Sequence, residues 1–198
     1  MRKIGLFGGS FNPIHKGHVK LALSIKEKLS LDKVIFIPSG EAPHKSSEEY
    51  AKASDRLEMC RLAVEDYPFF EVSDYEISRE GKSYSIYTVR HFKEIYPDDE
   101  LYLMVGSDML LYFDKWYEYK EILKNVTLTA VSREGTDFEQ LEESAENLRE
   151  YGNVIVVNNE AFPVSSTLLS KKIKNNEDTS CYLSEKVVKY IILKKLYM

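Results

Sequence analysis

The sequence KIGLFGGSFNPIHKGH at residues 3–18 joins a short apolar run to a glycine-rich turn and the start of a helix. The apolar run ends at Gly8 and is typical of a buried strand. Beyond His18 the apolar residues recur at helical spacing, and a second apolar run over 34–37 closes the unit. A strand, a helix and another strand in this order predict parallel pairing of the two strands.

Strand and helix signals alternate along the rest of the chain. We expect strands over 101–105, 127–131 and 154–157, and a mostly extended stretch over 70–77. We expect helices over 53–67, 137–150 and 184–196. Two further helices are expected, one that begins at a capping Ser85 and one that follows Ser165. This alternation predicts an α/β protein with a Rossmann-like, doubly wound parallel sheet and helices on both faces. No linker or repeat interrupts it. We therefore expect one domain over 1–198, with the last helix, including Ile191 and Ile192, packed on it.

The composition is that of an ordinary globular protein. The chain has 198 residues and a net charge of -5, which argues against a protein that coats nucleic acid. The basic residues exceed the acidic ones only towards the two ends of the sequence. No apolar run is long enough to span a membrane, and two cysteines cannot build a disulfide framework. We expect a cytoplasmic protein with neither nucleic-acid nor membrane partners; its oligomeric state stays open, a homo-oligomer included.

The glycine-rich turn is the first candidate site. Gly8 and Gly9 follow the first strand, and an open parallel sheet binds ligands beyond the carboxyl ends of its strands. Glycines allow the backbone to approach a phosphate closely, and the N-terminus of the next helix attracts anions. The segment matches neither G-x-G-x-x-G nor G-x-x-x-x-G-K-[ST]. It offers instead His15 and His18, whose imidazoles, three residues apart, can face one ligand and donate hydrogen bonds to its oxyanions.

The string His15-Lys16-Gly17-His18 resembles the H-x-G-H signature of the nucleotidyltransferase superfamily, and residues 8–18 together resemble the bacterial nicotinate-nucleotide adenylyltransferase family. That family transfers AMP from ATP to nicotinate mononucleotide, with release of pyrophosphate, in NAD biosynthesis. Further matches follow in the family's order along the chain: Pro43-His44-Lys45, Arg56 and Met59, Ser83-Tyr84, Gly106-Ser107-Asp108, Trp116-Tyr117, Arg133, and Ser165-Ser166-Thr167.

The resemblance implies roles for these residues. The catalytic residues would be His15, His18 and Lys45. ATP would be bound by both histidines together with Gly8, Gly9, Ser10, Phe11, Gly106, Asp108, Ser165, Ser166 and Thr167. The mononucleotide would be bound by His44, Lys45, Ser85, Trp116, Tyr117 and Arg133. Mg²⁺ is expected as cofactor, held mainly by ATP phosphates and water, without a protein metal site. With these assignments, the fold would bring the two basic ends of the chain together around the triphosphate of ATP.

Several of these residues also have a purely structural explanation. Lys45 and Arg133 could be ordinary surface charges, and Trp116 could anchor the core. Asp108 could cap a helix. The Ser165 turn could also cap a helix, which is compatible with a phosphate at the same N-terminus.

The chain departs from the family pattern at two positions. Ser170 stands where the family has an arginine, and a serine lacks the guanidinium fork that binds phosphate. Tyr87 stands in place of an aspartate. Phosphopantetheine adenylyltransferase activity and an aminoacyl-tRNA synthetase fragment remain alternatives because those proteins share an H-x-G-H-like motif. Ser170 keeps a third alternative open, a non-catalytic nucleotide sensor. The sequence leaves the choice between nicotinate and nicotinamide open, although the resemblance favours nicotinate.

Overall fold

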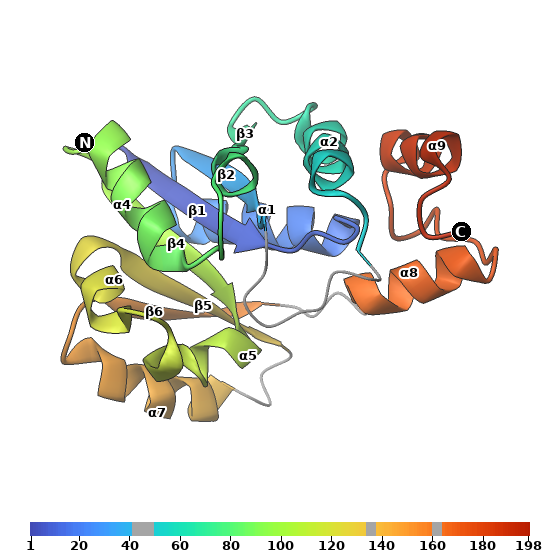
Figure 1. Cartoon of the computed structure of the whole chain (residues 1–198). Coiled ribbons are helices and arrows are strands. Elements are labelled where there is room, and N and C mark those ends of the chain that lie inside the picture. Colours follow the sequence, from blue (N-terminus) through green and yellow to red (C-terminus); the bar gives the residue numbers. More distant parts are fainter. Residues whose placement is uncertain (41–49, 134–137, 160–163) are drawn as a thin grey trace.

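The computed structural model describes residues 1–40, 50–133 without the Arg133 side chain, 138–159 and 164–198. Its six strands form one parallel sheet in the order β3-β2-β1-β4-β5-β6 (Figure 1). The strands are β1 (Lys3–Gly9), β2 (Lys33–Pro38), β3 (Phe70–Val72), β4 (Glu100–Gly106), β5 (Thr127–Arg133) and β6 (Val154–Asn159). The order reverses between β1 and β4, so the predicted doubly wound sheet is confirmed.

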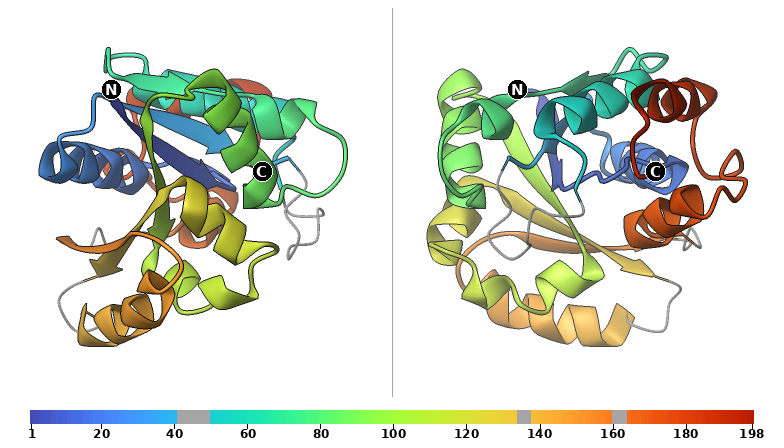
Figure 2. Two further views of the ribbon diagram at one scale, coloured as in Figure 1. Left: turned by 90° about the vertical axis from the view of Figure 1, so that its left-hand side faces the viewer. Right: turned by 45° about the vertical axis from the view of Figure 1, so that its right-hand side comes forward.

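Helices cover both faces of the sheet (Figure 2). One face packs against α1 (Lys16–Leu29) and α2 (Ala53–Val64), and the same buried cluster continues into α8 (Ser166–Lys174) and α9 (Glu185–Lys194), the latter packed on α2. The other packs against α4 (Ser85–Ile95), α5 (Ser107–Leu110), α6 (Tyr119–Asn125) and α7 (Phe138–Arg149). Two short turns, α3 (Tyr75–Ser78) and η2 (Phe113–Lys115), complete the described elements.

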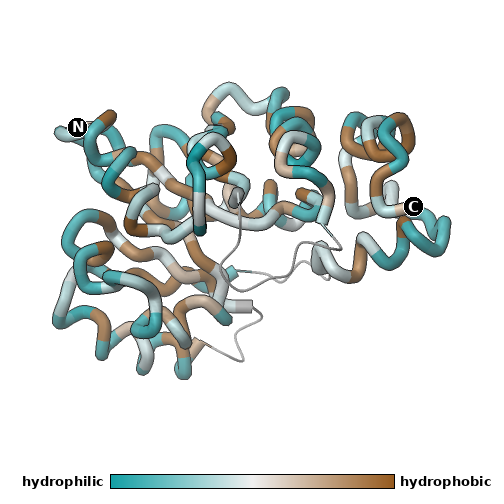
Figure 3. The backbone as a smooth tube through the Cα atoms, in the orientation of Figure 1, coloured by the Kyte–Doolittle hydropathy of each residue, from teal (hydrophilic) through white to brown (hydrophobic). Residues whose placement is uncertain are grey.

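Side-chain alternation along the strands divides the core into two layers. In β1, Leu6 packs with α4 and its neighbours, whereas the next residue, Phe7, packs on the side of α1 and α2. Leu103 and Met104 of β4 divide in the same way. Successive side chains of a strand point to opposite faces, so strands that are buried on both sides must be apolar throughout. Figure 3 shows this as hydrophobic colouring along the strands and polar colouring on the outer turns of the helices.

Most of the predicted elements are confirmed, and the errors are local. The stretch 70–77 is extended only over β3, because Tyr75–Ser78 form the helical turn α3. Ser85 is the first residue of α4 rather than its cap, since Tyr84 holds the N-cap position. In α9, Ile191 is buried but Ile192 is 60% exposed, so the prediction that both pack on the core is wrong for Ile192. The short helices α5 and α6 carry no strong periodic signal and were not expected.

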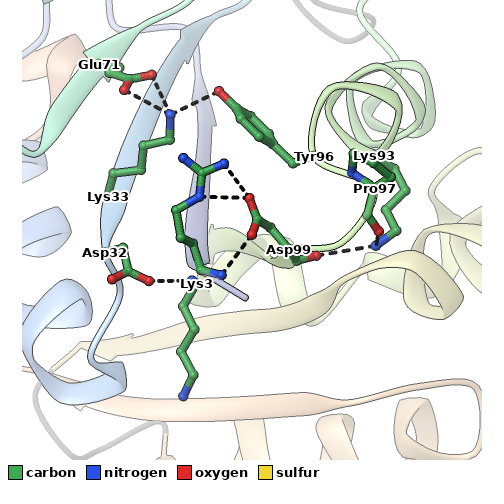
Figure 4. A network of polar contacts seen from close by, with 9 residues as sticks. Lys3, Asp32, Lys33, Glu71, Lys93, Tyr96, Pro97 and Asp99 are labelled. Atoms are coloured by element: carbon green, nitrogen blue, oxygen red, sulfur yellow. Dashed lines mark hydrogen bonds and ion pairs between the residues drawn. The ribbon is translucent and has the colours of Figure 1, made fainter.

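Charged residues tie together the amino ends of the strands, at the edge opposite to Gly9 (Figure 4). The Arg2 guanidinium donates to Asp99 Oδ2 at 2.7 and 3.0 Å and holds the pKa of that carboxyl below its usual range. Lys33 Nζ lies 2.9 Å from Glu71 Oε1 and 3.0 Å from Tyr96 Oη. Part of the basic charge of the first residues therefore lies away from the expected triphosphate.

Within the described ranges, no helix combines the length and the apolar character needed to cross a membrane. Cys60 is buried and Cys181 is exposed, and both are free thiols.

Candidate active site

The residues expected at the site gather where the strands end. Gly9 pairs with Pro38 across β1 and β2, and Gly106 pairs with Val131 across β4 and β5. All four strands are parallel, so Gly9, Gly106 and the end of β5 at Arg133 lie on the side of the sheet where the strands have their carboxyl ends. The strand order reverses there between β1 and β4, which is where open α/β sheets bind ligands.

The loop between β1 and α1 is held in place by several hydrogen bonds from distant parts of the chain. Its carbonyls and the Asn12 amide oxygen accept from donors on four other segments. These are Ser39 N to Gly9 O at 2.9 Å, Arg56 Nη1 to Ser10 O at 2.7 Å, Ala51 N and Tyr197 Oη to Asn12 Oδ1 at 3.0 and 2.8 Å, and Ser166 Oγ to Pro13 O at 2.9 Å. The loop is therefore fixed before any ligand binds, which reduces the entropy cost of binding a phosphate.

The two histidines stack on each other where the loop enters α1. Their ring centroids are 3.7 Å apart, and His15 is the N-cap of the helix. The backbone N–H of His15 donates to Nδ1 of His18 at 3.2 Å. Because Nδ1 accepts this bond, neutral His18 carries its proton on Nε2. His18 can therefore present an N–H donor to an anion at the helix N-terminus.

His15 is the more buried of the pair. It is 7% exposed, and this burial lowers its pKa from about 6.5 to about 4. Its Nδ1 is buried and has no hydrogen-bond partner among the described residues. A buried ring nitrogen without a partner is uncommon in a native fold. His15 is thus a neutral imidazole at physiological pH, which can form a hydrogen bond but carries no charge.

The side chain of Phe11 points into the core. It is 2% exposed, and its ring packs edge-on against Phe7 at 5.4 Å and against His18 at 5.1 Å. Its φ of 43° is in the left-handed region, where residues other than glycine are uncommon. Phe11 can therefore offer only its backbone to a ligand, while its ring supports His18.

The N-terminus of α8 faces the same loop. Ser165 caps the helix, because its Oγ accepts from Leu168 N at 3.2 Å, and Ser166 Oγ joins it to Pro13. Thr167 is exposed beside them. The hydroxyl of Ser170 donates to the carbonyls of the preceding turn, and it is not directed to a ligand as an arginine would be. The predicted cap and the predicted anion site thus share one helix end.

Tyrosine rings surround the start of α4 on the other side of the sheet. Tyr117 is 50% exposed and lies 5.1 Å from Tyr84 and 6.4 Å from Tyr87, measured between ring centroids. Trp116 is half-buried and packs on Phe113 at 4.8 Å, so it is in part the core anchor that its structural explanation anticipated. Of the expected pair, Tyr117 is the ring that is open to a ligand.

The structure describes some of the remaining expected residues and not others. Gly106 caps α5, so Asp108 is an exposed first-turn residue and not the N-cap. His44 and Lys45 lie outside the described residues, as does the side chain of Arg133. Their assignments stay predictions. The described residues contain no group of three or more His, Cys, Asp or Glu side chains that could hold a metal ion.

Comparison with known proteins identifies the family. A model of the cytidylyltransferase-like family matches residues 6–172. A nicotinate-nucleotide adenylyltransferase of Bacillus subtilis (strain 168) is 35% identical over 197 residues, which cover 100% of this chain and 99% of that protein. The chain belongs to the nicotinate-nucleotide adenylyltransferase family. A probable nicotinate-nucleotide adenylyltransferase of Carboxydothermus hydrogenoformans is 40% identical over 98% of both chains.

A solved structure supports the same fold. Nicotinic acid mononucleotide adenylyltransferase of Plasmodium falciparum, complexed with NaAD, superposes with a TM-score of 0.82 at 18% identity. The alignment covers 100% of this chain and 98% of that one. At this identity the similarity concerns the fold.

Sequence reasoning missed the residues that hold this adenylyltransferase site together. Arg56 was noted only as a family match, yet its guanidinium binds the loop carbonyl of Ser10. The one available signal was an arginine among apolar positions of a helix, since α2 buries Arg56 together with Leu57 and Met59. Nothing local indicated that Tyr197, next to the last residue, bonds to Asn12.

Proposed function

We propose that this chain transfers the AMP moiety of ATP to nicotinate mononucleotide, giving nicotinate adenine dinucleotide and pyrophosphate in NAD biosynthesis. The observation that carries the proposal is the hydrogen-bonded glycine loop, which ends in a stacked histidine pair at the switch point of the sheet. Identities of 35% and 40% to nicotinate-nucleotide adenylyltransferases over nearly the full chain support the substrate class.

The reaction needs little acid–base chemistry from the protein. An oxygen of the mononucleotide 5′-phosphate attacks the α-phosphorus of ATP, and the bond from that phosphorus to the bridging oxygen of the pyrophosphate breaks in line. A phosphate monoester has its second pKa near 6, so the attacking oxygen is already deprotonated at neutral pH. Positioning of the two phosphates and stabilisation of the developing charge are what the site must supply.

We propose particular groups for these tasks, and the described contacts support the proposal. His18 donates from Nε2 to an α-phosphate oxygen in the transition state, because its Nδ1 is held by the His15 backbone. Neutral His15 forms a hydrogen bond to the triphosphate. The backbone of Gly8 and Gly9 and the N-terminus of α8 at Ser165 receive phosphate oxygens without adding charge.

Further groups are assigned from the family pattern. Ser10, Gly106 and Asp108 complete the ATP site beside the glycine loop. Lys45 neutralises phosphate, and His44 and Arg133 bind the mononucleotide phosphate. The proposal for these three residues rests on their sequence positions at or after the ends of strands.

The start of α4 suits the ring and carboxylate of nicotinate. The first-turn N–H groups of a helix are unpaired and lie at its positive end, so a carboxylate there is favoured over a neutral carboxamide. Ser85 is the first residue of this 11-residue helix, and the side chain of its N-cap residue, Tyr84, makes no cap hydrogen bond. The Tyr117 ring stands beside it and offers a face for a flat pyridine ring. This combination favours nicotinate over nicotinamide, and over the flexible chain of phosphopantetheine.

Mg²⁺ fits this site as a companion of ATP. No group of metal ligands occurs among the described residues, and Mg²⁺ commonly keeps several waters and binds substrate phosphates. Its contribution would be to neutralise phosphate charge during the transfer.

Pyrophosphate release from the purified protein tests the proposal. With Mg²⁺, ATP and nicotinate mononucleotide we expect continuous release that depends on both nucleotides. A protein that binds ATP tightly but releases no pyrophosphate with any mononucleotide would be a nucleotide sensor. Ser170 favours this alternative, because it stands where the family pattern has a phosphate-binding arginine. Transfer to phosphopantetheine alone would support the other alternative.

A further inference from the structure

Arg56 is a buried cation whose partners are backbone carbonyls. The residue is 3% exposed, and burial lowers the pKa of its guanidinium. Its donors reach Ser10 O at 2.7 Å, Ser39 O at 2.6 Å, Ala51 O at 3.2 Å and Gly40 O at 3.3 Å. Burying a charge is costly, so this guanidinium is retained against a desolvation penalty that an apolar side chain would not incur.

The four carbonyls belong to three separate segments. Ser10 is in the glycine loop, Ser39 and Gly40 follow β2, and Ala51 precedes α2. A guanidinium is a rigid planar fork with five donors, so one side chain fixes the spacing of all three segments. A lysine at this position would have three donors on one nitrogen and could not hold the same separations.

The polar contacts continue from Gly40 to the start of α4. The N–H of Gly40 donates to Ser83 Oγ at 3.1 Å, and the Ser83 hydroxyl also bonds to the carboxyl of Glu76. Thr88 Oγ1, on α4 itself, lies 2.6 Å from Glu76 Oε1. Burial raises the pKa of Glu76, and both hydroxyls satisfy its oxygens.

A single line of hydrogen bonds thus joins the two halves of the site. It runs from Ser10 in the glycine loop through Arg56 and Gly40 to Ser83, which lies two residues before α4. The glycine loop is on the ATP side of the proposed reaction, and the start of α4 is on the acceptor side. Neither Arg56 nor Ser83 is among the groups assigned to a substrate.

We propose that Arg56 and Ser83 are positioning residues that set the glycine loop against the start of α4, and so align the α-phosphorus of ATP with the acceptor phosphate. The inference rests on the proposed adenylyl transfer. In-line attack requires the reacting atoms to be within about 3.5 Å and collinear with the leaving group, and a misplacement of about 1 Å can reduce the rate by about 10². A change in this line therefore alters turnover more than it alters binding of either substrate alone.

Arg56→Lys and Ser83→Ala test the proposal, with Arg61→Lys as the matched control. Arg61 is on the same helix, exposed, and paired only loosely with Glu58 at 3.6 Å. Kinetics are measured at a temperature at which circular dichroism shows each variant to be fully folded. We expect Arg56→Lys to reduce kcat at least tenfold while the KM for ATP changes less than threefold. Ser83→Ala should reduce kcat at least threefold, and Arg61→Lys should leave both constants unchanged.

The double variant supplies a readout that a merely structural role would not move. If both residues act through one line of contacts, Arg56→Lys combined with Ser83→Ala loses little more in kcat than Arg56→Lys alone. Independent contributions would instead multiply, and that result would overturn the proposal.

Other outcomes are equally decisive. A folded Arg56→Lys protein with kcat within twofold of the unaltered protein, even with a lower Tm, makes Arg56 only a stabilising residue. If Arg56→Lys does not fold, the Ser83→Ala variant decides alone, and an unchanged kcat overturns the proposal. An unaltered protein without adenylyl transfer refutes the proposed function and this inference together, whereas an active protein with active variants refutes the inference only.

Discussion

Acidification should destabilise this protein through His15. Burial lowers the pKa of His15 to about 4 in the folded state, whereas in the unfolded chain it is about 6.5. Below pH 6.5 the unfolded chain therefore binds a proton that the folded protein does not, and stability is lost as the pH falls towards 4. Linkage gives a loss of about 2 kcal/mol between pH 7.5 and pH 5 from this residue, with the folded pKa of His15 taken as about 4.

Urea denaturation at a series of pH values measures this contribution. The unaltered protein is compared with His15→Gln, in which the side chain cannot titrate, so that the other ionisable groups largely cancel in the difference. We expect the stability advantage of the unaltered protein over His15→Gln to shrink by about 2 kcal/mol from pH 7.5 to pH 5. Parallel stability curves over this range would refute the assignment of a buried, neutral His15.

Three further predictions concern the site. His18→Ala should lose about 10² or more in kcat, measured by pyrophosphate release, because the Nε2–H donor to the transition state is removed; near-normal turnover would exclude this role. Tyr117→Ala should raise the KM for the mononucleotide with little change in Tm, since this ring is half exposed; an unchanged KM would mean that no ring stacks there. Ser166→Ala removes the bond to Pro13 O and should reduce stability by about 1 kcal/mol and raise the KM for ATP. Thermal unfolding and ATP titration check this change, and an unchanged KM would separate α8 from the ATP site.

The fold could be predicted because its determinants are local in the sequence. Strands such as Leu101–Val105 are buried on both faces, so they are continuous apolar runs that differ plainly from the periodic helices between them. The errors occurred where the local signal is weak. Tyr75–Ser78 makes a single turn too short for periodicity. Ile192 follows Ile191 on a helix, where adjacent residues point about 100° apart, and only Ile191 faces the core here.

The candidate site was predictable in its parts but not in its assembly. Gly8, Gly9 and the histidines are neighbours in the sequence, and a glycine turn after a strand has a chemical meaning on its own. The contacts that fix the loop come from far away, such as Ser166 on Pro13, 153 residues apart. A serine on a helix gives no local sign of such a partner.

The positions of the charged residues in the fold could also be predicted only in part from the sequence. The basic excess of the first residues suggested cations around a triphosphate, and the fold does bring α8 to the glycine loop. Arg2 and Lys33, however, are paired with carboxylates at the opposite edge of the sheet. The positive charge at the site therefore depends on fewer residues than the sequence suggested. Lys45 and Arg133 are the candidates to supply it.

A competition between acceptors tests the central claim most directly. The purified protein is supplied with ATP, Mg²⁺ and equal concentrations of nicotinate mononucleotide, nicotinamide mononucleotide and phosphopantetheine, and the products are separated by mass. We predict that nicotinate adenine dinucleotide forms first and in excess, because the uncapped start of α4 favours a carboxylate. Dominant adenylylation of either other acceptor, or the absence of any adenylylated product, would contradict the account.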